Sequence, residues 1–203
     1  ALARLGYQVS ATDLFPQMVS VANTNALAAD VKIRFKTAGF GSIAPAFPGE
    51  QFDAVLCLGN SLPHVNSLSD LQRALQDFAA LMGPGALLLL QQRNFDAVMH
   101  AKNRFMEPQT HSSGDQEWVF FRFYDFEPNG KIQFSVLTLT RKPGGAWEST
   151  INSTFLLPIL SEDLRAALEL AGFQDLRFYG NMKGEAYDSA ASGDLIVVAR
   201  KNA

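Results

Sequence analysis

Residues 5–18 constrain the fold of this chain more than any other segment. They contain a glycine turn at Gly6, a short apolar strand that ends in the acidic residue Asp13, and Pro16, where a new helix can begin. A strand that leads directly into a helix is typical of an open α/β sheet. The order also predicts that residue 1 already lies inside a helix, and that the strand and glycine-rich turn that should open this helix are missing from the sequence.

Asp13 is the strongest single candidate for a functional residue. It is expected at the carboxyl end of a strand, where open α/β sheets bind nucleosides and where a carboxylate can accept two hydrogen bonds from a ribose. The alternative is that Asp13 caps the helix that begins near Pro16. Its place at the tip of a strand favours ribose binding.

Strands and helices alternate through the first half of the chain. Helices are predicted over residues 16–29 and 69–81, the second with Ser69 as its cap. The predicted strands are 32–37, 52–58 and 86–90, and the continuous apolar run 52–58 is typical of a strand buried on both faces of a sheet. This alternation predicts a doubly wound, parallel α/β sheet.

The second half of the chain has a different pattern. Residues 118–126, 131–140 and 146–157 are β-rich runs separated by turns that contain Asn-Gly and Gly-Gly, which predicts antiparallel hairpins. A helix over 161–171 and strands over 173–179 and 195–200 are expected to close the chain. We therefore expect one domain, 1–203, with an antiparallel insert at 118–157.

The insert carries a cluster of aromatic residues. We expect them mostly to form its buried face, and alternatively to cover a ligand pocket or a subunit contact in a homo-oligomer. The cluster consists of Trp118, Phe120, Phe121, Phe123, Tyr124 and Phe126.

Composition excludes several classes of protein. The net charge of −3 lacks the basic footprint of nucleic-acid binding or a polybasic membrane patch, and no apolar run is long enough to span a bilayer. The single cysteine, Cys57, excludes an internal disulfide framework and is expected to be a buried, inert thiol. His64, His100 and His111 have no metal-ligand spacing, so no metal site is predicted. A cytoplasmic globular domain is expected.

Three motifs in this order resemble class I S-adenosylmethionine-dependent methyltransferases. They are residues 6–18, residues 52–61 and the Gly-Pro-Gly turn at 83–85. The resemblance implies a Rossmann-like sheet, seven-stranded when complete and with an antiparallel last strand, and S-adenosylmethionine as cofactor. It implies cofactor binding by Asp13, Leu14, Met18, Gly39, Phe40, Leu58, Gly59 and His64. Met18 as a core residue, Phe40 as a turn-filling aromatic and His64 as an exposed loop residue are the structural alternatives. The family's glycine-rich first motif is missing.

A narrower resemblance is to glycine and sarcosine N-methyltransferases. It is carried by residues 57–61 with His64, by Arg93-Asn94-Phe95-Asp96 and by residues 184–187. The resemblance implies that Arg93 and Asn60 bind the carboxylate of an amino-acid acceptor and that Tyr187 belongs to the same site. The chain departs from this group at 91–92, where two glutamines replace an Asp-His pair, and at 156–157, where leucines stand in place of tyrosines.

The position of Arg93 supports the same role independently. It follows an apolar strand, so its guanidinium is expected at the carboxyl edge of the sheet, where ligands bind and where a planar fork suits a carboxylate. The alternatives are that Arg93 pairs with Asp96 or caps a helix, and that Asn60 stabilises a loop.

No catalytic residue is assigned. Methyl transfer depends on positioning more than on acid–base groups, so the sequence needs no nucleophile–His–Asp set. The main prediction is a methyltransferase that acts on a small molecule. A non-catalytic protein of the same fold and a nicotinamide-dependent oxidoreductase are the alternatives.

Overall fold

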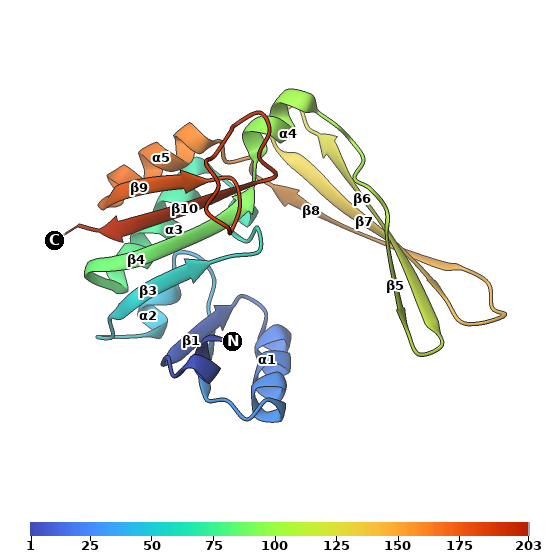
Figure 1. The fold of residues 1–203 in the computed structure, drawn as a ribbon, viewed down its shortest axis with the longest axis horizontal. Helices are drawn as coiled ribbons and strands as arrows, with labels where there is room; N and C mark the ends of the chain where they lie inside the picture. Colours follow the sequence, from blue (N-terminus) through green and yellow to red (C-terminus); the bar gives the residue numbers. More distant parts are fainter. Residues whose placement is uncertain (203) are drawn as a thin grey trace.

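The computed structural model describes residues 1–202. The chain begins with the short helix η1 (Leu2–Leu5), followed by β1 (Val9–Asp13), α1 (Pro16–Ala28) and β2 (Ile33–Thr37). β1 and β2 pair in parallel and form a sheet of their own, with α1 beside it (Figure 1). The predicted strand–helix–strand order at the start of the chain is confirmed.

A four-stranded sheet forms the centre of the molecule. Its strands lie in the order β3 (Phe52–Cys57), β4 (Met82–Arg93), β10 (Asp194–Lys201) and β9 (Phe173–Tyr179). β3 and β4 are parallel, whereas β10 is antiparallel to both of its neighbours, as predicted for the last strand. Within residues 1–202 no strand pairing joins β1 or β2 to β3, so the α/β strands form two separate sheets.

The core lies between the central sheet and the helices α3 (Leu68–Ala80) and α5 (Ser161–Leu170), which cover one of its faces (Figure 1). Leu71, Leu75 and Phe78 recur at helical spacing on α3 and are at most 2% exposed. Alternate residues of the sheet meet them, as the period of a strand requires. Fully buried members of β4 and β10 include Leu88, Leu90, Leu195, Val197 and Ala199.

Hydrogen bonds define the helix ends on this face. The cap of α3 is Ser67, whose Oγ accepts the amide of Asp70 at 3.1 Å, so the prediction of Ser69 as the cap was wrong. Ser67 is extended and directly precedes the helix, which is the geometry that a cap needs. Asp77 of α3 is buried and accepts the amides of Ile43 and Ala44 at the start of α2 (Ile43–Ala46).

A long antiparallel sheet extends away from this centre (Figure 1). It follows α4 (Phe95–Ala101), and we call its four strands the arm: β5 (Gln109–Ser113), β6 (Gln116–Phe126), β7 (Ile132–Arg141) and β8 (Glu148–Leu156), paired in that order. The last three match the predicted hairpin strands. The sequence analysis missed α4 and β5, because both are short and lack a clear period.

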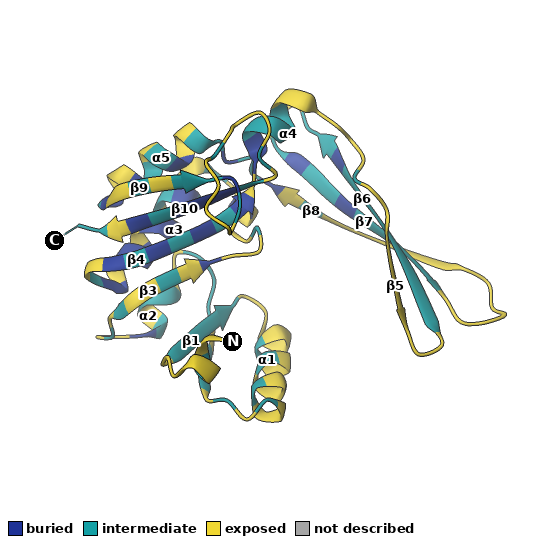
Figure 2. Ribbon diagram, in the orientation of Figure 1, coloured by how far each residue is buried: buried dark blue, intermediate teal, exposed yellow. Residues whose placement is uncertain are grey.

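The predicted burial of the aromatic cluster was wrong for most of its members. Only Tyr124 is buried, in a small cluster with Phe95, Ile132 and Leu156 where the arm meets α4. The other five aromatic residues of the cluster are half-buried. No second layer of structure covers the outer part of the arm among the described residues, so side chains on both of its faces remain partly exposed (Figure 2).

The burial of residues 52–58 on both faces of a sheet was also not observed. Cys57 is buried, but Leu56 is 43% and Leu58 38% exposed. The reason is that β3 pairs only with β4 in the described chain, and that α3 and α5 lie on one face of the sheet. No described helix is both long and apolar enough to cross a membrane.

Candidate cofactor and acceptor site

Except for Tyr187, which lies in the loop between β9 and β10, the predicted site residues lie at or beyond the carboxyl ends of β1 to β4. β1 ends at Asp13, β3 leads into Gly59 and Asn60, and β4 ends at Arg93. In a parallel α/β sheet these ends form the ligand-binding edge. The site is therefore described from β1 to β4, starting with the residues proposed for the cofactor.

Asp13 uses one of its carboxylate oxygens in a local turn. Oδ1 accepts the amide of Phe15 at 2.9 Å, and no hydrogen bond is formed by Oδ2 within residues 1–202. The N-cap residue of α1 is Phe15, which makes no side-chain hydrogen bond to the first turn of this helix. Asp13 therefore stabilises the turn before α1 and does not cap the helix. One carboxylate oxygen remains available for hydroxyl groups.

Leu14 and Gly39 are in close contact beside Asp13. A Cβ at position 39 would lie 2.8 Å from Cδ1 of Leu14, so only glycine fits there without displacing that side chain. Leu14 is 63% and Met18 52% exposed, which leaves both as apolar surface next to Asp13. The alternative that Met18 is a core residue was wrong, because its side chain is exposed.

Phe40 packs toward the central core. Its ring meets that of Phe78 edge-on, with centroids 5.8 Å apart, which agrees with the turn-filling alternative. A role of Phe40 beside the adenine stays a prediction.

The turn after β3 is tied to the end of β4. Gly59 has φ +73°, a left-handed conformation that favours glycine, and its amide donates to Oε1 of Gln91 at 2.6 Å. Asn60 is also left-handed, with φ 62°, and its Oδ1 accepts the amide of Arg93 at 2.9 Å. Asn60 therefore has a structural role in this turn. His64 lies in η2 (Leu62–His64), just beyond the turn, and is exposed.

Arg93 faces an acidic residue that the sequence analysis did not identify. The pairing of β4 with β10 places Arg93 directly opposite Asp194, and Nη1 lies 3.6 Å from Oδ1 of that carboxylate. The predicted alternative pairing with Asp96 was wrong, because Asp96 accepts the amide of Ser161 and contacts Tyr187 instead. The Arg93 side chain is 48% exposed, so it is accessible to a ligand.

Tyr187 belongs to a network that holds the loop of residues 180–193. Its hydroxyl oxygen lies 2.6 Å from Asn94 Oδ1 and 2.6 Å from Asp96 Oδ2, and its single proton can be donated to either acceptor. Burial and the Asp96 carboxylate raise the pKa of Tyr187, so the phenol is neutral. Asn94 is 1% exposed, and its amide group donates to the carbonyls of Asp188, Ser189 and Ser192. Tyr187 therefore connects the loop to α4, next to Arg93.

Three functional candidates escaped the sequence analysis. Asp194 pairs with Arg93, Gln91 links Gly59 to Asp194 through Nε2 at 3.4 Å, and Asn94 anchors the loop. Asp194 could have been found by aligning the last strand antiparallel to 86–93. The contacts of Gln91 and Asn94 depend on tertiary structure and leave no signal in the sequence.

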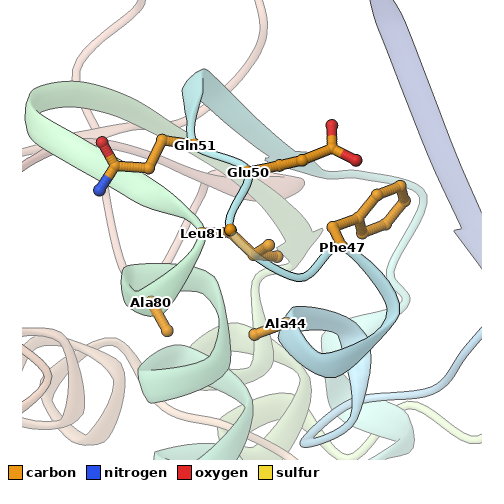
Figure 3. A pocket seen from close by; sticks show the side chains of 7 residues that line it. Ala44, Phe47, Glu50, Gln51, Ala80 and Leu81 are labelled. Atoms are coloured by element: carbon orange, nitrogen blue, oxygen red, sulfur yellow. The ribbon is translucent and has the colours of Figure 1, made fainter.

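A cavity lies away from this edge. It has a volume of about 370 Å³ and is lined by residues between α2 and β3 and at the end of α3, including Phe47, Glu50 and Leu81 (Figure 3). These residues precede β3 or β4, whereas most of the predicted site residues follow the strands. This cavity is therefore not the predicted site.

Comparisons with known proteins agree on the class of protein. Residues 1–85 match a family described as a methyltransferase domain. A glycine/sarcosine N-methyltransferase of Aphanothece halophytica is 25% identical over 99% of this chain and 71% of its own length. A glycine/sarcosine/dimethylglycine N-methyltransferase of Actinopolyspora halophila is 34% identical over 97% of this chain, which spans only 33% of that protein.

Solved structures show the same fold. An S-adenosylmethionine-dependent methyltransferase from Clostridium acetobutylicum superposes with a TM-score of 0.77 at 12% identity, over 97% of this chain and 76% of that one. The CcbJ methyltransferase from Streptomyces caelestis gives 0.79 at 16% identity, over 100% of this chain and 78% of the other. CalS10 of Micromonospora echinaspora is an amino pentose methyltransferase with bound S-adenosylmethionine. It superposes with a TM-score of 0.74 at 18% identity, over 96% of this chain and 74% of that one.

Proposed function

Because this chain belongs to the S-adenosylmethionine-dependent methyltransferases, we propose that it methylates the amine of a small amino acid such as glycine or sarcosine. The glycine/sarcosine N-methyltransferases that it resembles at modest identity support this acceptor class. The family does not agree with the nicotinamide-dependent oxidoreductase that the sequence left open.

The observation that carries the proposal is the position of Arg93. Its guanidinium is half-exposed at the carboxyl end of β4, and Asn60 at the neighbouring end of β3 accepts its backbone amide. A planar guanidinium can donate two parallel hydrogen bonds to a carboxylate. Asp194 at 3.6 Å keeps this side chain near the strand end without a close ion pair.

The residues at the end of β1 fit the cofactor. Asp13 has an unused carboxylate oxygen that suits ribose hydroxyls, and Leu14 and Met18 present apolar surface beside it. Bound S-adenosylmethionine supplies an electrophilic methyl group on a sulfonium. The chain's own task is then to hold a neutral amine in line with that methyl group and to exclude water.

We also propose that residues 1–203 belong to one methyltransferase domain, with residues 118–157 as its antiparallel insert. The arm that contains them leaves the central sheet after β4 through α4, and the chain returns through α5 to β9 and β10. Both ends of the insert therefore meet the same sheet.

The substitution Arg93→Lys in the full chain tests the acceptor. Lysine keeps the charge but loses the paired donors, so we expect kcat/KM for glycine to fall by about tenfold or more. The loss should be small for glycine methyl ester, which lacks the carboxylate, and the Kd of S-adenosylmethionine should stay within about twofold of wild type. Equal behaviour of wild type and variant toward a panel of amino acids would reject a carboxylate site at Arg93.

A further inference from the structure

One face of the arm presents a continuous apolar surface. The registers of β6 with β7 and of β7 with β8 pair odd-numbered residues with odd-numbered residues, and successive side chains of a strand alternate between its faces. The odd-numbered side chains of these three strands therefore project from the same side of the arm, which we call the open face. Its apolar residues include Val119, Phe121, Phe123, Leu137, Leu139 and Ile151.

The opposite face is covered where the arm meets α4, but the open face is not. The even-numbered residues Tyr124, Ile132 and Leu156 are buried in one cluster with Phe95 of α4. Among residues 1–202, no apolar side chain of the open face is buried, and Ile151 is 58% exposed. A contiguous apolar surface that stays uncovered in this way marks a site where another molecule docks.

Charged residues are confined to the two ends of the open face. At the outer end, Nη2 of Arg141 lies 2.7 Å from Oε2 of Glu117. At the inner end, near α4, Nη2 of Arg104 lies 2.7 Å from Oδ1 of Asp125. Every odd-numbered residue of β6, β7 and β8 between these two ion pairs is uncharged. A partner that presents the same pattern in the opposite direction would set one ion pair against another and would bury no lone charge.

Side-chain size also differs between the two ends. At the inner end, Phe105 lies beside Phe123 and is 69% exposed, and Phe155 is 54% exposed. At the outer end, the smaller residues Val119 and Leu139 lie opposite each other on β6 and β7. The projecting rings of one copy can therefore pack on the smaller side chains of a second copy whose arm runs in the opposite direction. A two-fold axis produces both of these contacts at once.

The open face is large enough for a stable dimer. The strands β6, β7 and β8 are 11, 10 and 9 residues long and belong to a four-stranded sheet. With about 4.8 Å between strands and about 3.4 Å per residue, one face of such a sheet measures about 600 Å². Two copies would then bury about 1,200 Å² in total, which is at the lower end of the range for specific interfaces.

We propose that the open face binds a second copy of this chain, and that the two arms pack face to face with their strands in opposite directions. A second copy fits because the surface is self-complementary in both charge and side-chain size, as an isologous contact requires. The dimer covers the apolar middle of both arms and brings the inner ion pair of each copy to the outer ion pair of the other. This proposal does not depend on which acceptor is methylated.

The test compares Ile151→Asp with Asn152→Asp as a matched control. Both residues are exposed neighbours on β8, but only Ile151 belongs to the open face. Sedimentation velocity over a concentration series of the full chain should show a dimer for wild type and for Asn152→Asp. We expect Ile151→Asp to raise the dimer Kd by about 30-fold or more, because a two-fold contact contains the new charge twice. A monomeric wild type, or a dimer that Ile151→Asp weakens no more than Asn152→Asp does, would overturn the proposal.

Cross-linking tests the direction of the two arms without removing the apolar contact. Gln133 and Leu139 lie near opposite ends of β7 on the open face, and the native Cys57 is buried. Chains with Gln133→Cys are mixed with chains with Leu139→Cys and treated with a bismaleimide whose spacer is about 10 Å, the separation of packed sheets. The mixture should cross-link, and neither variant alone should do so. Cross-linking of each variant with itself, and not of the mixture, would overturn the opposed direction of the arms.

Discussion

Residues 1–46, which we call the N-terminal unit, and the central sheet are built from the same kinds of elements but differ sharply in burial. No residue of 1–46 is buried, although β1, α1 and β2 are regular and paired. By contrast, β4 of the central sheet and the helix α3 that packs on this sheet contain several fully buried leucines. Backbone hydrogen bonds are thus enough to define strands and helices, but of these two regions it is the central sheet that buries the apolar area that stabilises a fold.

This difference divides the two halves of the site. The residues proposed for the ribose lie on the N-terminal unit, whereas Arg93, Asn60 and Asp194 lie on the central sheet. A bidentate ion pair links the two parts: Arg34 of β2 donates to both carboxylate oxygens of Glu50, which precedes β3. Exposed ion pairs stabilise weakly, so the acceptor half should be the more rigid of the two.

The largest expected effect comes from equal truncations in the two regions. Leu75 of α3 is 0% exposed and Leu27 of α1 is 81% exposed. We expect Leu75→Ala to lower the free energy of unfolding by about 2–5 kcal/mol, because it leaves a cavity. Leu27→Ala should change it by less than about 0.5 kcal/mol.

Urea titration followed by far-ultraviolet circular dichroism measures both changes. Fluorescence is less suitable, because Trp118 and Trp147 are the only two tryptophans and both belong to the arm region. A loss for Leu27→Ala as large as that for Leu75→Ala would show that the N-terminal unit has a core of its own, and the comparison would fail.

A smaller effect is expected at Asp13, and it should appear in binding and not in stability. Asp13→Ala should weaken S-adenosylmethionine by about 1–3 kcal/mol, the cost of leaving polar groups unpaired in a site. Asp13→Asn is the control, because its amide oxygen can still accept the Phe15 amide that Oδ1 now holds. Calorimetric isotherms that stay the same for both variants of the full chain would leave Asp13 as a turn residue.

The smallest effect is a pH dependence that comes from burial in the central sheet. Burial raises the pKa of the Cys57 thiol to about 12, whereas a cysteine in the unfolded chain has a pKa of about 8.5. The unfolded state loses this proton first, so stability is fully present below the unfolded pKa and is lost as pH rises toward the folded one. Between about pH 8 and about pH 9.5 the free energy of unfolding should fall by about 1 kcal/mol more in wild type than in Cys57→Ala. Parallel pH profiles would contradict the burial of this thiol.

The sequence predicted the regular elements better than their surroundings. The strands near 173–179 and 195–200 and the hairpins of the arm follow from local patterns, and the structure has them. The apolar run 52–58 predicted burial on both faces and failed, because apolar character cannot say which neighbours cover a strand. The aromatic cluster of the arm failed for the same reason.

The candidate site could be predicted only up to the strand ends. Asp13, Gly59, Asn60 and Arg93 follow from where strands stop, and the structure places them there. Their partners come from elsewhere in the chain: the pairing of Asp194 with Arg93 depends on the register of two antiparallel strands. Such contacts are set by tertiary packing and not by local sequence.

The network around Asn94 has a consequence for the dynamics of turnover. The loop of residues 180–193 is bonded to Asn94 through the carbonyls of Asp188, Ser189 and Ser192, and through the hydroxyl of Tyr187. A segment held by a buried side chain in this way opens only when several hydrogen bonds break together, which makes opening rare. The loop is therefore a fixed wall and not a lid.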